Sequence, residues 1–164
     1  STRKKVDMQI GDKIPSFTLP TPDGGTVSSD DLKGGWTVIY FYPKDNTPGC
    51  TTEAKDFSAE IEAFQALGAR VIGISADSPK KHANFIAKQE LKVELLSDED
   101  TSVCEAFGVW VEKKMYGKTY MGILRSTFIV APDLKVAHEW KKVKVKEHAS
   151  DVLSTLKEAI NQHN

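Results

Sequence analysis

Residues 37–42 read Thr-Val-Ile-Tyr-Phe-Tyr, and this run constrains the fold more than any other part of the chain. A continuous apolar, β-branched and aromatic run is typical of a strand that is buried on both faces. A second run of this kind covers residues 71–75. Between the two, residues 48–67 carry apolar side chains at helical spacing and are followed by Gly68, a natural helix stop. A strand, a helix and a strand in this order indicate an α/β protein.

The remaining segments extend this pattern. Ser78 and Pro79 predict the start of a helix that runs to about residue 89. Further expected elements are a short strand at 93–96, a short helix at 101–107, strands at 126–130 and 136–145 around a turn at 132–133, and a last helix at about 146–161. The turn-rich segment 11–35 predicts a small hairpin with Phe17 and Leu19 facing inward.

We therefore expect one domain over residues 1–164, with a central mixed β-sheet flanked by helices and an N-terminal β-hairpin. The thioredoxin-like fold has this order of elements. Residues 1–9 are expected to form a flexible tail or an added segment, and Met8 is a candidate native start.

The segment from Tyr42 to Glu53 lies between the first buried strand and the first long helix, where open α/β sheets bind ligands. Thr47 is a candidate N-cap and Pro48 a candidate first helical residue, which places Cys50 in the first turn. Unpaired N–H groups and the positive end of the helix dipole stabilise a thiolate there. An ordinary cysteine is already a few per cent thiolate at neutral pH, so complete ionisation would raise the thiolate fraction only about thirtyfold. A fast reaction also needs hydrogen-bond donors aimed at the substrate atoms whose charge changes in the transition state.

The spacing Pro43-x-x-x-Thr47-x-x-Cys50 resembles the peroxiredoxin signature, and the flanking residues are similar to its bacterioferritin-comigratory-protein (PrxQ) branch. Later segments agree with this branch, among them residues 95–98, 107–110, 115–118 and 125–128. The resemblance implies that Cys50 is the peroxidatic cysteine, that Thr47 orients the peroxide, and that Pro43 shields the site from water.

The same resemblance assigns supporting roles. Arg125, just ahead of a strand, would be the guanidinium that supports the thiolate and the transition state, a task that suits its permanent charge and rigid fork. Glu53 would orient Arg125, and Gly49 belongs to the turn beside the cysteine. The implied enzyme is a peroxiredoxin that reduces hydrogen peroxide and organic hydroperoxides through a Cys50 sulfenic acid, with no cofactor and no metal.

Recycling of that sulfenic acid is the open question. Relatives in this branch often carry a resolving cysteine at one of two positions, which here are Lys55 and Ile86. We expect a one-cysteine cycle in which an external thiol such as thioredoxin, glutaredoxin or glutathione reacts directly with Cys50. The alternatives are a two-cysteine cycle with Cys104 as an atypical resolver, or a redox-sensing or chaperone role. Cys104 lies in a short apolar segment, where a small buried thiol is ordinary.

Other classes of thiol protein need residues that this chain lacks. A thioredoxin-type dithiol enzyme needs a second cysteine where Glu53 stands, and a copper metallochaperone needs one at Ala54. The nearest enzymatic rival, a glutathione-peroxidase-like protein, fits the signature and Arg125 less well. A net charge of −1 favours neither nucleic acid nor membrane binding. The histidines, expected at the surface and without ligand spacing, are His82, His138, His148 and His163.

Two further expectations concern surface and location. The lysine run at 141–146 alternates with Val143 and Val145, which predicts the charged face of an edge strand. We expect a monomer, with a dimer as the alternative. Sparse cysteines favour a reducing compartment, so the expected location is the cytoplasm, or an organelle stroma if residues 1–7 follow a removed transit peptide.

Overall fold

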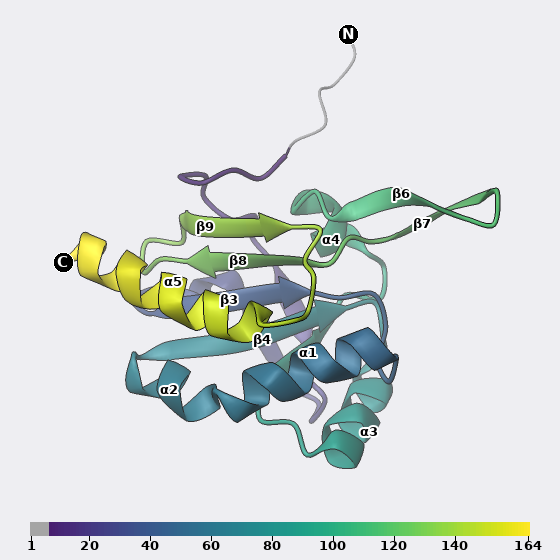
Figure 1. Ribbon diagram of the computed structural model, residues 1–164, viewed down its shortest axis with the longest axis horizontal. Helices are drawn as coiled ribbons and strands as arrows, with labels where there is room; N and C mark the ends of the chain where they lie inside the picture. The colour runs from purple at the N-terminus through teal and green to yellow at the C-terminus, as the bar shows by residue number, and fades with distance from the viewer. Residues whose placement is uncertain (1–6) are drawn as a thin grey trace, which may run out of the picture.

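A five-stranded mixed sheet forms the centre of the computed structural model, which describes residues 7–164 (Figure 1). Its strands, in spatial order, are β5 (Glu94–Ser97), β4 (Ala69–Ser75), β3 (Trp36–Phe41), β8 (Ser126–Val130) and β9 (Val136–Lys141). β3, β4 and β5 are parallel, whereas β8 runs antiparallel to both β3 and β9. The predicted α/β architecture with a mixed sheet is therefore confirmed.

The sheet separates two hydrophobic cores. Because successive side chains of a strand point to opposite faces, Val38 and Tyr40 of β3 enter one core while Ile39 and Phe41 enter the other. The first core is covered by helices, which are α1 (Pro48–Ala59), α2 (Ile61–Ala66), α3 (Pro79–Gln89) and α5 (His148–His163). In Figure 1, α1, α2 and α5 lie in front of the sheet.

The N-terminal hairpin and α4 cover the opposite face. The hairpin consists of β1 (Thr18–Pro20) and β2 (Thr26–Ser28) and leads into the 3-10 helix η1 (Ser29–Leu32). Phe17 and Leu19 are buried, as predicted, in the same core as residues of α4 (Ser102–Ala106). Covering on both faces explains why every residue of β3 is buried.

The predicted helix over residues 48–67 is interrupted. α1 ends at Ala59 and α2 begins at Ile61, because Glu60 leaves helical geometry with φ −99° and ψ 7°. Phe57 and Phe64 nevertheless both reach the same core. Neither glycine nor proline marks the break, so the apolar spacing continues across it and conceals it.

β9 is shorter than predicted. It ends at Lys141, and Lys142 adopts a left-handed conformation with φ 53°. The N–H of Val143 donates to the carbonyl of Arg125 outside the strand pairing. The lysine run is therefore an edge-strand face only at its start, and the rest of it follows the strand.

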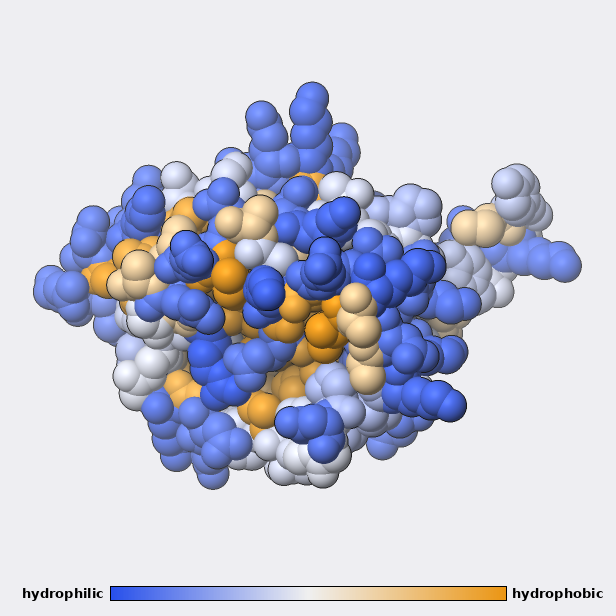
Figure 2. Space-filling view, turned by 90° about the horizontal axis from the view of Figure 1, so that it is seen from below, coloured by the Kyte–Doolittle hydropathy of each residue, from blue (hydrophilic) through white to orange (hydrophobic). Residues whose placement is uncertain are grey.

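The structure adds a hairpin that the sequence analysis left unassigned. β6 (Trp110–Met115) and β7 (Lys118–Ile123) pair with each other around Tyr116 and Gly117, both with positive φ. This hairpin projects from the body of the molecule in Figures 1 and 2. Its side chains are largely exposed, and Tyr116 at the tip is 98% exposed.

The prediction that the histidines lie at the surface is wrong for two of them. His82 and His148 are buried, with 0% and 4% of their surface exposed. Burial lowers the pKa of His148 to about 4, so its ring is neutral, and Nε2 forms a hydrogen bond of 2.8 Å with the Thr127 hydroxyl. His82 forms part of a polar cluster described below.

Most of the expected tail, residues 1–6, lies outside the described residues. Met8, however, is 3% exposed and packs into the core beneath the N-terminal hairpin. The prediction that the flexible tail extends to residue 9 is therefore wrong at Met8. Within residues 7–164, no helix combines the length and apolar character needed to cross a membrane.

Candidate active site

The loop between β3 and α1 places Cys50 at the start of a helix. Thr47 occupies the N-cap position with extended backbone, Pro48 begins α1, and Cys50 lies in the first turn, as predicted. The Thr47 hydroxyl does not cap the helix but donates to the carbonyl of Lys44 at 2.8 Å. The first N–H groups of α1 therefore have no side-chain cap, and the positive end of the helix dipole faces the thiol.

Arg125 approaches this thiol from the segment between β7 and β8. Its Nη2 lies 3.3 Å from Cys50 Sγ, and its Nη1 donates to Glu53 Oε1 at 2.6 Å. Cys50 and Glu53 are three residues apart on one face of α1, so a single guanidinium reaches both. Glu53 is thus in direct contact with Arg125, and its role in orienting the guanidinium stays a prediction.

Gly49 gives the guanidinium its room. A Cβ atom at this position would lie 3.3 Å from Arg125 Nη2, closer than nine in ten Cβ contacts in proteins. The glycine therefore lets the guanidinium approach the helix without a shift of a few tenths of an ångström, in addition to its place in the turn.

Burial changes the ionisation of the groups around the thiol. It raises the pKa of Glu53 from 4.5 to about 7, and the attraction of Arg125 only partly opposes this. Glu53 Oε2 is buried and has no hydrogen-bond partner among residues 7–164. Burial lowers the pKa of the Arg125 guanidinium, but Glu53 and Cys50 together outweigh this effect and raise it. The charge of Arg125 is therefore permanent.

Lys113 is a second cation near the thiol that sequence reasoning missed. Its aliphatic stem crosses Gly122 on the neighbouring strand, where an added Cβ would lie 3.2 Å from Lys113 Cδ. Burial and repulsion from Arg125 lower the pKa of Lys113, while Cys50 raises it. One lysine among many carries no sequence signal for this position, because its direction depends on the register of the hairpin.

Cys104 has a different environment on the other side of the sheet. It is 0% exposed and belongs to the core beneath the N-terminal hairpin, whereas Cys50 belongs to the helix-covered core. The Asp98 carboxylate accepts the N–H groups of Val103 and Cys104 at 3.2 and 2.7 Å. Burial raises the pKa of the Cys104 thiol far above its usual range, and Asp98 raises it further.

The other named positions lie around this centre. The Pro43 side chain is exposed at the start of the loop, and its role as a shield stays a prediction. Lys55 is exposed on α1. Ile86 of α3 lines a mainly apolar hollow of about 310 Å³ together with Leu95 and Leu96.

Comparisons with known proteins agree with this geometry. Residues 10–139 match the AhpC/TSA family. The chain is 49% identical to peroxiredoxin Bcp of Bacillus subtilis over 153 residues, which cover 93% of this chain and 98% of that protein. It is 44% identical to peroxiredoxin Bcp of Escherichia coli K12, with coverage of 92% and 97%.

Solved structures give the same result. A structure of the Xanthomonas campestris bacterioferritin comigratory protein, described for its alkyl peroxide reduction activity, is 48% identical with a TM-score of 0.83, covering 86% of this chain and 90% of that one. A mutant of Xylella fastidiosa PrxQ is 40% identical with a TM-score of 0.88, covering 93% and 97%.

The fold and these similarities define a thiol peroxidase built on the thioredoxin-like fold, as the sequence analysis predicted. The chain belongs to the AhpC/TSA family and, within it, to the Bcp/PrxQ subfamily of peroxiredoxins.

Proposed function

We propose that Cys50 is the peroxidatic residue of a one-cysteine cycle that reduces hydrogen peroxide and organic hydroperoxides. The observation that carries this proposal is the 3.3 Å contact between Arg125 Nη2 and Cys50 Sγ at the uncapped start of α1. A fixed cation and a helix N-terminus at one sulfur are the environment in which a thiolate is stable and reactive.

In the first step, the Cys50 thiolate attacks the terminal oxygen of the hydroperoxide. The S–O bond forms as the O–O bond breaks, the leaving oxygen takes a proton and departs as water or an alcohol, and Cys50 becomes a sulfenic acid. Arg125 stabilises the negative charge as it moves from sulfur to the leaving oxygen, because its charge is already in place before the reaction.

Thr47 would orient the incoming peroxide. Its hydroxyl hydrogen is committed to the Lys44 carbonyl, so the hydroxyl oxygen is left as an acceptor. A hydroperoxide O–H that donates to this oxygen points its terminal oxygen along a defined direction. The main-chain N–H groups at the start of α1 supply donors to the other oxygen.

A second thiol then restores the enzyme. An external thiol attacks the sulfenic sulfur, forms a mixed disulfide and releases water, and a further thiol frees Cys50. Three features support an external reductant: Cys104 lies on the opposite face of the sheet, and residues 55 and 86 are lysine and isoleucine. Thioredoxin, glutaredoxin and glutathione are the candidates, and a monomer in the cytoplasm remains the prediction for state and location. The alkyl peroxide activity described for the Xanthomonas relative supports organic hydroperoxides as substrates.

Peroxide consumption with a thiol reductant tests the proposal. Cys50→Ser is expected to abolish turnover, whereas Cys104→Ser is expected to retain it over many cycles with thioredoxin. Mass spectrometry after one equivalent of peroxide should find a sulfenic adduct on Cys50. Full activity of Cys50→Ser would end the proposal, and an internal disulfide would replace the one-cysteine cycle by the Cys104 alternative. A protein that is oxidised but never turns over would instead indicate a redox sensor.

A further inference from the structure

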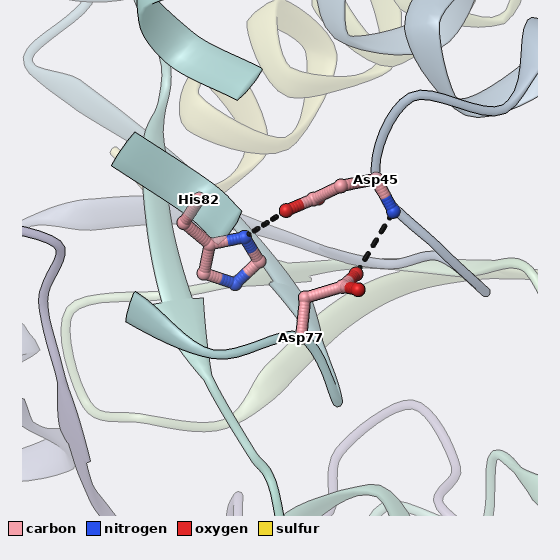
Figure 3. A group of neighbouring side chains, drawn as sticks. All are labelled: Asp45, Asp77 and His82. Carbon is pink, nitrogen blue, oxygen red and sulfur yellow. Dashed lines mark hydrogen bonds and ion pairs between the residues drawn. The ribbon is translucent and has the colours of Figure 1, made fainter. Parts of the chain in front are cut away.

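Three buried polar side chains meet beside the loop that carries Cys50 (Figure 3). Asp45 belongs to this loop, Asp77 follows β4, and His82 lies in α3. His82 Nδ1 lies 2.7 Å from Asp45 Oδ2, and the N–H of Asp45 donates to Asp77 Oδ2 at 2.8 Å. The exposed fractions are 0% for His82 and 7% for each aspartate. The cluster therefore joins three separate segments at a largely buried position.

The hydrogen-bond partners fix the number of protons in this cluster. His82 Nε2 lies 3.0 Å from the carbonyl oxygen of Leu96, which can only accept, so Nε2 carries a hydrogen. Nδ1 and Asp45 Oδ2 face each other, and one proton must lie between them, whichever atom holds it. Without that proton, two lone pairs and a net negative charge would meet in the protein interior.

The second carboxylate oxygen of Asp45 is held as well. The Tyr42 hydroxyl donates to Oδ1 at 2.6 Å, and burial raises the pKa of Tyr42 well above its usual range, so this donor is permanent. The Ser75 hydroxyl donates to Asp77 Oδ2 at 2.7 Å. Among the described residues, the charged and titratable groups that face the ring are thus Asp45, Asp77 and Tyr42. With Nδ1 and Oδ2 in direct contact, the arrangement is a hydrogen-bond network and leaves no room between them for a metal ion.

These bonds anchor the loop that forms the active site. Asp45 is held through both carboxylate oxygens and its N–H, two residues before Thr47 and five before Cys50. Cys50 is only 1% exposed in this closed arrangement. A protein thiol therefore cannot reach its sulfur until the loop opens.

We propose that His82 is a positioning residue for the peroxidase reaction: together with Asp45 it forms a hydrogen-bonded clamp that keeps the Cys50 loop closed for peroxide attack and whose release admits the reductant. The proposal rests on the function proposed above for Cys50. It assigns opposite effects to the two half-reactions. A broken clamp slows oxidation of Cys50 by peroxide, because Thr47 and the helix start lose their alignment, and speeds the reaction of the sulfenic acid with a thiol.

Three variants test the clamp. His82→Leu leaves Asp45 without its partner and should open the loop. Asp45→Asn is the conservative rescue: its amide N–H donates to a neutral Nδ1 and its oxygen accepts from Tyr42, so every bond is satisfied without the additional proton. Asp98→Asn is the matched control, because it alters a buried carboxylate on the opposite face of the sheet.

Hydrogen exchange of residues 43–52 is the first measurement, and it needs no peroxide. His82→Leu should raise exchange there by roughly tenfold or more, while β8 stays protected. Asp45→Asn and Asp98→Asn should stay near the wild type in this segment.

Single-turnover kinetics are the second measurement. In His82→Leu, oxidation by hydrogen peroxide should slow while reduction of the sulfenic acid by thioredoxin accelerates. Equal losses in both half-reactions, or exchange that rises uniformly along the chain, would overturn the clamp. If His82→Leu does not fold, Tyr42→Phe decides, because it removes the hydroxyl that donates to Asp45 Oδ1. Exchange of residues 43–52 that stays at the wild-type level in Tyr42→Phe overturns the proposal. Because exchange requires no turnover, it tests the clamp even if Cys50→Ser were to remain active.

Discussion

The two cysteines occupy equivalent positions in two helices on opposite faces of one sheet. Each is the third residue of its helix, and each helix has a threonine N-cap without a side-chain cap bond. Both thiols are almost fully buried, with 1% of Cys50 and 0% of Cys104 exposed. Their position in the helix and their burial therefore do not distinguish them, although the Thr47 backbone is extended and the Thr101 backbone is left-handed.

The charged groups next to the two cysteines do distinguish them. At α4 the Asp98 carboxylate takes the N–H groups of Val103 and Cys104, so a negative charge occupies the positive end of the helix. At α1 the Thr47 hydroxyl turns away to Lys44, and the Arg125 guanidinium faces the sulfur. The group that occupies the helix N-terminus decides whether a thiol there is suited to react or is inert.

Removal of the cation should bring Cys50 closest to Cys104 in behaviour. For Arg125→Met we expect kcat/KM for peroxide to fall about 10²–10³-fold, the size of effect found when one preorganised donor is lost. Arg125→Lys keeps the charge without the fork that spans Cys50 and Glu53, and it should recover only part of the activity. Stopped-flow oxidation of Cys50 gives the rate, and a loss below about threefold in Arg125→Met would contradict this comparison.

The ionisation of Glu53, the carboxylate beside Cys50, should make the free energy of unfolding depend on pH. The pKa of Glu53 is raised from 4.5 to about 7, so the folded protein keeps a proton that the unfolded chain releases. The resulting stabilisation is fully present below pH 4.5 and is lost as the pH rises towards 7, by on the order of 3 kcal/mol. Glu53→Gln should remove this slope. Urea unfolding from pH 4 to pH 8 measures it, and parallel curves for the two proteins would show that Glu53 does not titrate in this way.

The reverse exchange makes Cys104 more like Cys50. Asp98→Asn removes the negative charge at α4, so the pKa of Cys104 should fall, although burial still holds it above its usual range. One N–H at the helix start loses a charged acceptor, at a cost of about 1–2 kcal/mol in the free energy of unfolding. Iodoacetamide labelling of Cys104 in a Cys50→Ser background measures the thiol. Unchanged labelling at high pH would mean that Asp98 has little influence.

The smallest expected effect concerns the hairpin cation. Lys113→Met should lower kcat/KM about threefold at low ionic strength, and added salt should reduce the difference. Lys114, the next residue along β6, points to the opposite face of the hairpin and provides the control in Lys114→Met. Equal effects of the two variants would assign the loss to net charge and not to the site.

The sequence predicted what depends on neighbours along the chain. Thr47, Pro48 and Cys50 follow from capping rules within one turn of helix, and the buried strand pattern revealed the sheet. Arg125 lies 75 residues from Cys50, so only the family resemblance connected them.

The remaining features depend on three-dimensional register. The direction of Lys113 is set by pairing within the hairpin, and the contact of His82 with Asp45 requires α3 to dock against the β3–α1 loop. The break at Glu60 escaped because the apolar spacing of Phe57 and Phe64 fits a continuous helix equally well. These are long-range outcomes that no local pattern encodes.

Two cations on different structural elements, Arg125 and Lys113, contribute to the electrostatic potential at Cys50. Arg125 immediately precedes β8 of the central sheet, while Lys113 is carried by two strands that pair only with each other. Coulomb energy falls with distance, so the effect of each charge on the sulfur is set by the element that holds it at its distance. The contribution of Lys113 to the electrostatic potential at the thiol therefore depends on the position of the hairpin, whereas the contribution of Arg125 depends on the start of β8 in the central sheet.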